Sequence, residues 1–385
     1  MSMGALAGVR VVDLSRVLAG PLCTQILADH GADVIKVEPP KGDETRTLGP
    51  PFDDNGDAAY FAAVNRGKRA LSLDLSKPEG RAVLEKLLEN ADVLVENFLP
   101  GTMERWGMGY ETLAKRFPRL VYCTITGFGA DGPLGGLPGY DAVLQAMCGI
   151  MSINGSEESG PMRMGVPIVD YLTGYTALTG ILMALYVRER TGKAQKVEAT
   201  LFDTALSLLV PHAANWLASD RAPGLLGSAH PNISPYDKFR AGNGELFLGV
   251  LNDGQFKRLC EHISRQDLFD DPRFKSNATR LANRDALRAE LEQAFAAFEV
   301  ESLCKDLMAK GVPAGPVHNV PQAFAQPHAA HRQMLVERDG YRGVGVPLKL
   351  SATPGRAGRR PPRFDEHAAE IRAQAGIGDQ PVLSK

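Results

Sequence analysis

The chain has 385 residues, of which 44% are hydrophobic and 23% are charged, and its formal net charge is −2. This is the composition of an ordinary globular protein with ample apolar material, and its length predicts two domains. The near-neutral charge does not indicate nucleic-acid binding.

No apolar run reaches the roughly 18 residues that a membrane helix needs, and ALTGILMALYV (177–187) is typical of a core helix. The N-terminus lacks the basic and apolar segments of a signal peptide. Five scattered cysteines without a C-x-x-C pair predict a reduced, cytoplasmic chain. The eight histidines form no H-x-x-x-H pair on an expected helix, so we expect no metal.

The first 130 residues alternate short apolar runs with amphipathic segments. The expected strands are VRVVDLS (9–15), DVIKVE (33–38), LSLDL (71–75), DVLVENF (92–98) and LVYCTITGF (120–128). The expected helices between them are PLCTQILADHG (21–31), EGRAVLEKLLENA (79–91) and ETLAKRF (111–117). Short links between alternating strands and helices predict an α/β fold with a doubly wound parallel sheet.

The second half of the chain predicts a long helix and then a smaller domain. DYLTGYTALTGILMALYVRER (170–190) is expected to be helical, and KVEATLFDTALSLLVPHAANWL (196–217) to be a strand followed by a helix. After residue 220 a connector rich in Gly, Pro and Ser leads into one strand and three amphipathic helices. We therefore assign 1–224 to a large domain, 225–325 to a smaller α+β domain and 326–385 to a C-terminal segment.

Gly127, Gly129 and Gly132 spell G-x-G-x-x-G after a strand, the pattern of a dinucleotide-binding loop. Such a loop opens a helix, whereas PLGGLPGYD (133–141) follows here and contains two prolines. The acidic residue expected about 20 residues later is also missing. The pattern therefore favours a glycine-rich loop at the carboxyl end of a parallel strand.

Asp170 precedes the long helix, and two interpretations remain open from the residues alone. It is either an N-cap that accepts backbone N–H groups, or a carboxylate nucleophile kept ionised by the helix dipole. Cations near the strand ends are likewise either solvated surface charges or a site for anionic ligands; they are Arg16, Lys36, Lys41, Arg46, Arg66, Lys68 and Arg69. Asn97, Phe98 and Arg105 follow another strand and either contact a ligand or turn the chain.

Eight motifs occur in an order that resembles the family III CoA-transferases, the CaiB/BaiF group. They are VVDLSRVLAGP, GADVIKVEPPKGD, NRGKRALSLDL, VENFLPG, ITGFGADGP, GYD, MRMGVPIVDYLTG and GVPAGPV, within residues 5–350. The resemblance implies an interlocked homodimer in which each Rossmann-like large domain is built from both chain ends. It also implies that Asp170 is the nucleophile, which favours that interpretation over a cap alone.

The resemblance further implies the chemistry and the substrates. Asp170 would attack an acyl-CoA thioester and form a mixed anhydride, and CoA would then pass to a free organic acid without a metal or redox cofactor. By the same resemblance, Val17, Leu18, Ala19, Leu73, Asn97, Phe98 and Arg105 would bind CoA. The formyl-CoA transferases have a glutamine where this chain has Leu18, which argues against formyl or oxalate as substrate. Their glycine-run loop is also replaced, by SAHPNISPYDKF (228–239).

The same family contains 2-methylacyl-CoA racemases, which use a G-H-D histidine as an acid/base. This chain has Gly139-Tyr140-Asp141 instead, and a tyrosine titrating near pH 10 is poorly suited to fast proton exchange. We therefore expect a transferase, with Tyr140 orienting a carboxylate or an acyl oxygen. Four arginines are candidates for binding a second carboxylate, which favours dicarboxylates with succinyl-CoA as donor: Arg16, Arg46, Arg66 and Arg163. A non-catalytic CoA-binding protein is the alternative outside the enzymes.

Overall fold

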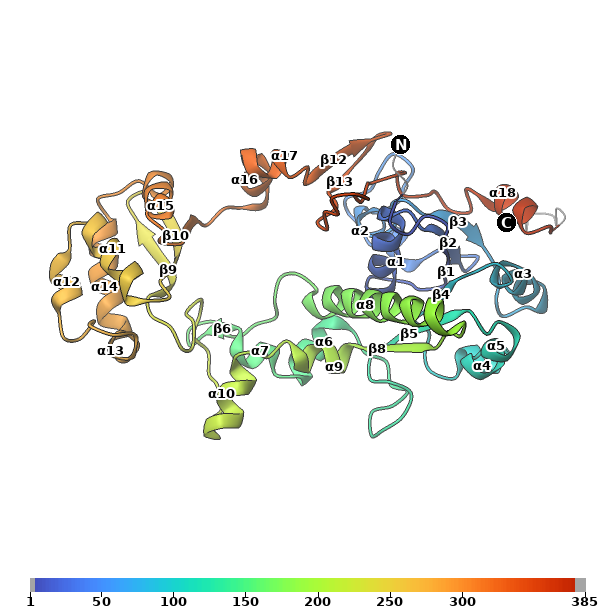
Figure 1. Cartoon of the computed structure of the whole chain (residues 1–385), viewed down its shortest axis with the longest axis horizontal. Coiled ribbons are helices and arrows are strands. Elements are labelled where there is room, and N and C mark those ends of the chain that lie inside the picture. The colour runs from blue at the N-terminus through green and yellow to red at the C-terminus, as the bar shows by residue number, and fades with distance from the viewer. Residues whose placement is uncertain (1–3, 378–385) are drawn as a thin grey trace. The chain divides into compact units, whose positions relative to one another are not determined.

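The computed structural model describes residues 4–377, and they divide into two compact units (Figure 1). Of these residues, the large unit comprises 4–148, Met164–Leu208 and 327–377. The small unit comprises Gly149–Arg163 and Leu209–Gln326. The small unit therefore starts earlier than residue 225, and it includes the short segment that precedes the long helix.

The large unit is built on a six-stranded parallel sheet with the strand order β3-β2-β1-β4-β5-β8. Its strands are β1 (Arg10–Asp13), β2 (Asp33–Glu38), β3 (Arg69–Ser72), β4 (Val93–Glu96), β5 (Val121–Thr126) and β8 (Lys196–Thr200). The strand order reverses between β1 and β4, so a crevice is expected at the carboxyl ends of these two strands. The predicted doubly wound α/β fold is confirmed.

Helices pack on both faces of this sheet. The helices of the large unit are α1 (Ala19–Asp29), α2 (Ala59–Ala63), α3 (Pro78–Leu88), α4 (Thr102–Arg105), α5 (Tyr110–Arg116), α6 (Asp141–Met147), α8 (Ile168–Thr191), α9 (Leu201–Ser207), α17 (Pro327–His331) and α18 (Ala368–Gln374), with a 3₁₀ turn η1 (Glu44–Thr47). On one face, Leu84 and Leu88 of α3 pack with Leu71 and Leu94 of the sheet. On the other face α8 packs against α1, β5 and β8.

Within residues 4–377, α8 alone is long and apolar enough to cross a membrane by length and composition. However, 44% of its most apolar 18-residue window is buried inside the protein. Its packing against α1 and the sheet is that of a core helix, as the sequence predicts.

The C-terminal segment returns to the large unit. It forms a hairpin of β12 (Leu335–Arg338) and β13 (Tyr341–Val344), and then α18 packs against β3. Ile371 of α18 is 1% exposed and belongs to the core of the large unit. Both ends of the chain thus contribute to this unit.

The small unit has an antiparallel sheet with the strand order β11-β10-β9, covered by amphipathic helices. Its strands are β6 (Gly155–Ser156), β7 (Gly160–Pro161), β9 (Tyr236–Ala241), β10 (Gly244–Gly249) and β11 (Ala314–Pro316). Its helices are α7 (Ile150–Ile153), α10 (His212–Ser219), α11 (Asp253–His262), α12 (Gln266–Asp270), α13 (Asn277–Ala282), α14 (Arg284–Phe295), α15 (Val300–Ala309) and α16 (Val320–Ala325). Phe256, Leu291 and Leu307 lie in its core, as the apolar periodicity of these helices predicts.

Candidate active site

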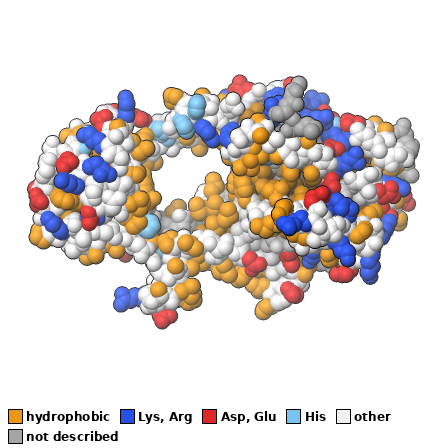
Figure 2. All heavy atoms as spheres, in the orientation of Figure 1, with side chains coloured by type: hydrophobic (Ala, Val, Ile, Leu, Met, Phe, Trp, Pro, Cys, Tyr) orange, Lys and Arg blue, Asp and Glu red, His pale blue; other side chains and the backbone are white. Residues whose placement is uncertain are grey.

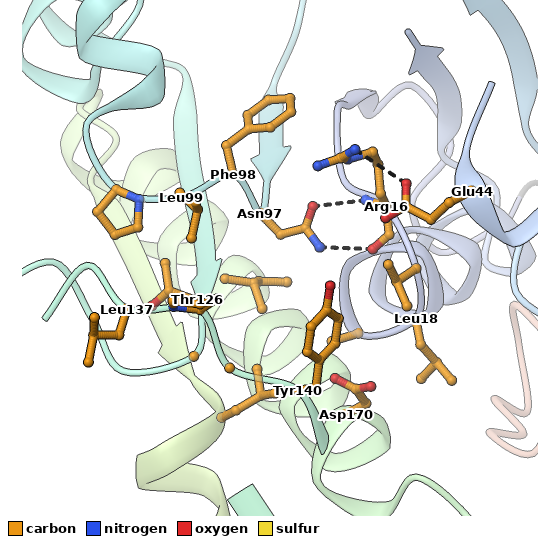
Figure 3. A pocket seen from close by; sticks show the side chains of 18 residues that line it. Arg16, Leu18, Glu44, Asn97, Phe98, Leu99, Thr126, Leu137, Tyr140 and Asp170 are labelled. Atoms are coloured by element: carbon orange, nitrogen blue, oxygen red, sulfur yellow. Dashed lines mark hydrogen bonds and ion pairs between the residues drawn. The ribbon is translucent and has the colours of Figure 1, made fainter. Parts of the chain in front are cut away.

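A cavity of about 260 Å³ lies in the large unit at the carboxyl ends of the strands (Figure 3). Its walls come from the segments that follow β1, β4 and β5, from the end of the glycine-rich loop and from the start of α8. The lining residues are 16–19, 97–100, 125–127 and 137–140, with Glu44, Asp170 and Leu201. The structure thus brings together Asp170, Tyr140, Val17, Leu18, Ala19, Asn97, Phe98 and Arg16 from the predicted set.

Asp170 lies in the first turn of α8, but its side chain does not cap the helix. The helix begins at Ile168, and its N-cap residue, Pro167, makes no side-chain cap. The capping carboxylate is that of Asp141, which accepts hydrogen bonds from the backbone N–H groups of Val169 and Asp170. The cap interpretation of Asp170 is therefore wrong, and its carboxylate lines the cavity instead.

The electrostatic environment of Asp170 also differs from the expectation. Burial, together with the nearby negative charge of Asp141, raises the pKa of Asp170 from 3.8 to about 7. Desolvation thus opposes the charged form of Asp170 more strongly than the helix dipole favours it. Asp170 is thus a carboxylate of unusually high basicity facing a cavity.

The exits of β1 and β4 are joined by a pair of hydrogen bonds. The backbone N–H of Arg16 donates to Asn97 Oδ1 at 2.8 Å, and Asn97 Nδ2 donates to the Arg16 carbonyl at 2.8 Å (Figure 3). Next to this pair Val17 has φ of 70°, a left-handed conformation that is strained for a β-branched residue. Asn97 therefore holds the β1 exit in place, and both polar atoms of its side chain are engaged in doing so.

Of the four candidate arginines, only Arg16 lines the cavity. Its guanidinium lies 3.3 Å from the Glu44 carboxylate and 5.7 Å from the centre of the Phe98 ring.

Arg46 and Arg66 are instead buried in ion pairs, with Glu38 and Asp57 for Arg46 and with Asp29 for Arg66. Because their charges are matched inside the fold, the structure contradicts their assignment as substrate-carboxylate ligands of this cavity. Arg163 belongs to the small unit and is not among the lining residues.

A second cavity of about 370 Å³ lies beside the first and shares Arg16, Phe98 and Leu99 with it. Leu73 lines this second cavity, together with apolar residues such as Val37, Pro39 and Leu75. The Phe98 ring meets the Trp106 ring edge-on, with centroids 5.3 Å apart. Arg105 lines neither cavity, and its guanidinium donates a hydrogen bond to Thr102 Oγ1 at 2.8 Å.

The glycine-rich loop shapes the edge of the first cavity. No helix follows β5 until Asp141, so the local structure does not support the dinucleotide-binding interpretation. The ends of the loop approach closely, because a Cβ on Gly127 would lie 2.8 Å from the backbone of Gly139. This contact places Tyr140 on the cavity wall, where its side chain is 67% exposed.

Two carboxylates of this site, Glu44 and Asp141, are not predicted as site residues by the sequence. Glu44 carries no pattern that distinguishes it from a surface residue. Asp141 carries one, since an Asp directly before an apolar helical segment is typical of a helix N-terminus. What the sequence does not reveal is that Asp141 caps α8, which begins 27 residues later than α6. Within residues 4–377 no cluster of His, Cys, Asp or Glu is arranged to hold a metal ion.

Comparison with known proteins gives the class to which this fold and site belong. The sequence matches CoA-transferase family III over residues 6–368. The chain belongs to this family, and the resemblance seen in its motifs is confirmed. It is accordingly a transferase enzyme.

Individual relatives cover nearly the whole chain. The succinate–glutarate CoA-transferase of Agrobacterium fabrum is 41% identical, over 96% of this chain and 95% of that protein. The acetyl-CoA:oxalate CoA-transferase of Acetobacter aceti is 41% identical, over 96% of each chain. The crystal structure of a CAIB/BAIF family protein from Brucella suis is 42% identical and superposes with a TM-score of 0.88, over 97% of this chain and 100% of that one.

Proposed function

We propose that this enzyme moves CoA from succinyl-CoA to a small dicarboxylic acid through covalent intermediates on Asp170. The observation that carries the proposal is the Asp170 carboxylate, which lines a cavity at the switch point of the sheet and has a pKa raised to about 7 by burial. The family and the relative that acts on succinate and glutarate support the reaction class and the substrates.

The proposed reaction moves the CoA thiolate from one acid to another by way of the Asp170 carboxylate. An oxygen of Asp170 attacks the thioester carbonyl, the carbon–sulfur bond breaks, and a mixed anhydride and the CoA thiolate result. The thiolate then attacks the Asp170 carbonyl and releases the first acid, which leaves an aspartyl-CoA thioester. The second acid attacks this thioester, which releases the CoA thiolate and forms a new mixed anhydride. The thiolate then attacks the acyl carbonyl of the second acid, which leaves as its CoA ester and frees the Asp170 carboxylate. The carboxylate starts and ends ionised, and no redox equivalent is consumed.

The high basicity of Asp170 supports its role as a nucleophile. A carboxylate with a pKa of 3.8 is a weak nucleophile, and nucleophilicity rises with basicity until protonation removes the reactive form. A pKa of about 7 leaves roughly half of the carboxylates ionised at neutral pH. Positioning in the cavity must supply much of the remaining rate acceleration.

The two adjoining cavities support the binding of a long substrate such as an acyl-CoA. The second cavity, with Leu73 and Phe98, offers apolar and aromatic side chains for the adenine ring, while the first holds the thioester near Asp170. Arg16 lines both cavities, so its guanidinium serves either the CoA phosphates or the distal carboxylate of the acid. Tyr140, which also lines the first cavity, orients the carboxylate or acyl oxygen.

A substrate panel tests this proposal. The enzyme is incubated with succinyl-CoA or acetyl-CoA and with glutarate, oxalate or a monocarboxylate, and the CoA esters are identified by mass spectrometry. We expect transfer from succinyl-CoA to glutarate to be fastest, and faster transfer to monocarboxylates would overturn the dicarboxylate assignment. Preferred transfer to oxalate would contradict the interpretation of Leu18.

Trapping experiments test the covalent role of Asp170. With succinyl-CoA and hydroxylamine, we expect a hydroxamate on the peptide that contains Asp170, and none in Asp170→Asn. CoA transfer that survives in Asp170→Ala would remove the proposed mechanism. Deuterium uptake at the α-carbon of a 2-methylacyl-CoA, without CoA transfer, would indicate a racemase. CoA binding without either reaction would indicate a binding protein.

A further inference from the structure

The first turn of α8 is held by a carboxylate from a different helix. Asp141, the first residue of α6, directs Oδ2 at the backbone N–H of Val169, 2.8 Å away, and at that of Asp170, 3.2 Å away. Asp141 is buried, with only 8% of its surface exposed. A buried carboxylate requires partners, and here two of its partners are the amides that carry the nucleophile.

The other oxygen of Asp141 extends this arrangement to the approach of α8. Asp141 Oδ1 accepts a hydrogen bond of 2.6 Å from the side-chain amide of Gln145, which is fully buried. Gln145 Oε1 in turn accepts the backbone N–H of Met164 at 2.8 Å. One face of α6 therefore fixes both the start of the segment leading to α8 and the first turn of that helix.

Asp141 affects Asp170 in two ways, through its hydrogen bonds to the backbone of α8 and through its negative charge. The other ionisable groups that line the cavity are Arg16, Glu44 and Tyr140. Burial raises the pKa of Tyr60 of α2, and the charges of Asp170 and Asp141 raise it further. Arg16 is paired with Glu44. Burial is the largest cause of the raised pKa of Asp170, and the charge of Asp141 is the second.

We propose that Asp141 is a positioning residue for CoA transfer, which orients the turn that carries Asp170 and opposes the ionisation of Asp170 through its own negative charge. This inference rests on the proposed role of Asp170 as nucleophile. Asp141 needs no contact with the substrate, because it acts through the backbone of α8 and through the electrostatic field at the nucleophile.

Asp141→Asn removes the charge and still presents one oxygen to the amides of α8, while its amide nitrogen gives up the hydrogen bond from Gln145. We expect the acidic limb of the kcat/KM–pH profile to move down by about one pH unit in this variant. At high pH, where Asp170 is ionised in both proteins, kcat is expected to fall because a less basic carboxylate is a weaker nucleophile. An unmoved acidic limb would overturn the proposal.

Asp141→Ala removes the acceptors for the amides of α8 as well as the charge. We expect kcat to fall at least tenfold below that of Asp141→Asn, with a smaller change in KM. Equal kcat values in the two variants would contradict the positioning role. Asp203→Asn is the matched control, because Asp203 is an exposed acidic residue in the first turn of α9 that does not line the cavity. Its profile is expected to match that of the wild type.

A titration of Asp170 by NMR, which needs no catalytic turnover, tests the role of Asp141 independently of the proposed function. In protein labelled with ¹³C at the aspartate carboxyls, the Asp170 signal is assigned by its loss in Asp170→Asn. We expect it to titrate near pH 7 in the wild type and at lower pH in Asp141→Asn. A wild type without CoA transfer would overturn the proposed function. Active wild type whose Asp170 signal titrates at the same pH in Asp141→Asn would overturn the inference alone.

Discussion

The Asp170 carboxylate experiences two opposing effects in the first turn of α8. The partial positive charge of a helix N-terminus favours an ionised carboxylate, whereas burial and a neighbouring negative charge disfavour it. In this chain Asp141 already accepts the nearest amides, so burial dominates and the pKa of Asp170 rises to about 7. Asp170, an aspartate whose ordinary pKa is 3.8, therefore has the basicity of a group that titrates near neutral pH.

The pH dependence of catalysis follows from this pKa. In the proposed mechanism only ionised Asp170 attacks the thioester, so we expect kcat/KM to rise with pH and to level off above about pH 7. At pH 5 the rate should be roughly a hundredfold below the plateau, since each pH unit below the pKa removes a factor of ten. Steady-state rates between pH 5 and pH 9 with succinyl-CoA measure this profile. A rate that is constant down to pH 5 would show that Asp170 is ionised throughout.

The same pKa predicts a stability gain when Asp170 loses its charge. Because the pKa is raised in the folded protein, ionisation of Asp170 destabilises the fold, and the stabilisation due to the neutral form is lost as pH rises through about 7. The unfolding free energy of Asp170→Asn should exceed that of the wild type by roughly 2–4 kcal/mol above pH 8, and by almost nothing below pH 4. Urea unfolding at several pH values measures this difference. A difference independent of pH would contradict it.

At the scale of elements, the site depends on how the β1 and β4 exits are joined. Asn97 pairs with both backbone polar groups of Arg16, beside the left-handed Val17. Strain of this kind persists only where surrounding contacts determine the backbone. The segment that leads into α1, and that lines the cavity through Leu18 and Ala19, thus depends on one side chain from a neighbouring strand.

Asn97→Ala is expected to weaken both activity and stability. It leaves the N–H and C=O of Arg16 without these partners, which costs about 1–3 kcal/mol of unfolding free energy. It also frees the strained segment, so we expect kcat/KM to fall roughly ten- to a hundredfold. Thermal unfolding and steady-state kinetics check the two effects. Asn90→Ala, at an exposed position, is the control, and equal behaviour of the two variants would contradict the role of Asn97.

The same scale shows how far the sequence allows the site to be predicted. Apolar runs and their spacing locate the strands and helices, and the order of motifs points to Asp170 and to the segments that line the cavity. The partners of the charged residues are not predictable in this way. Lys36 and Lys68 are candidates for an anion site from their positions, yet both are fully buried, paired with Asp43 and Asp13. Lys68 and Asp13 are 55 positions apart, and only the folded sheet brings them together.

At the scale of the whole molecule, both units expose apolar side chains. Met183 and Tyr186 of α8 are 62% and 63% exposed, and Trp216 and Leu217 of α10 are 50% and 72% exposed. Figure 2 shows orange side chains at the surface over α10 and over parts of the large unit. Exposed apolar groups of this size favour coverage by another protein surface. A second copy of the chain is the expected partner, since the family resemblance implies an interlocked homodimer.

Interlocking makes a sharper prediction than dimerisation alone. Native mass spectrometry is expected to give a species of twice the chain mass, at concentrations where ordinary dimers dissociate. When isotopically light and heavy preparations are mixed, mixed dimers should form only after unfolding and refolding, because threaded chains cannot separate while folded. Rapid exchange under native conditions would indicate a simple face-to-face dimer, in which dissociation follows mass action. A monomer at micromolar concentration would contradict both arrangements and leave the apolar residues of α8 and α10 facing water.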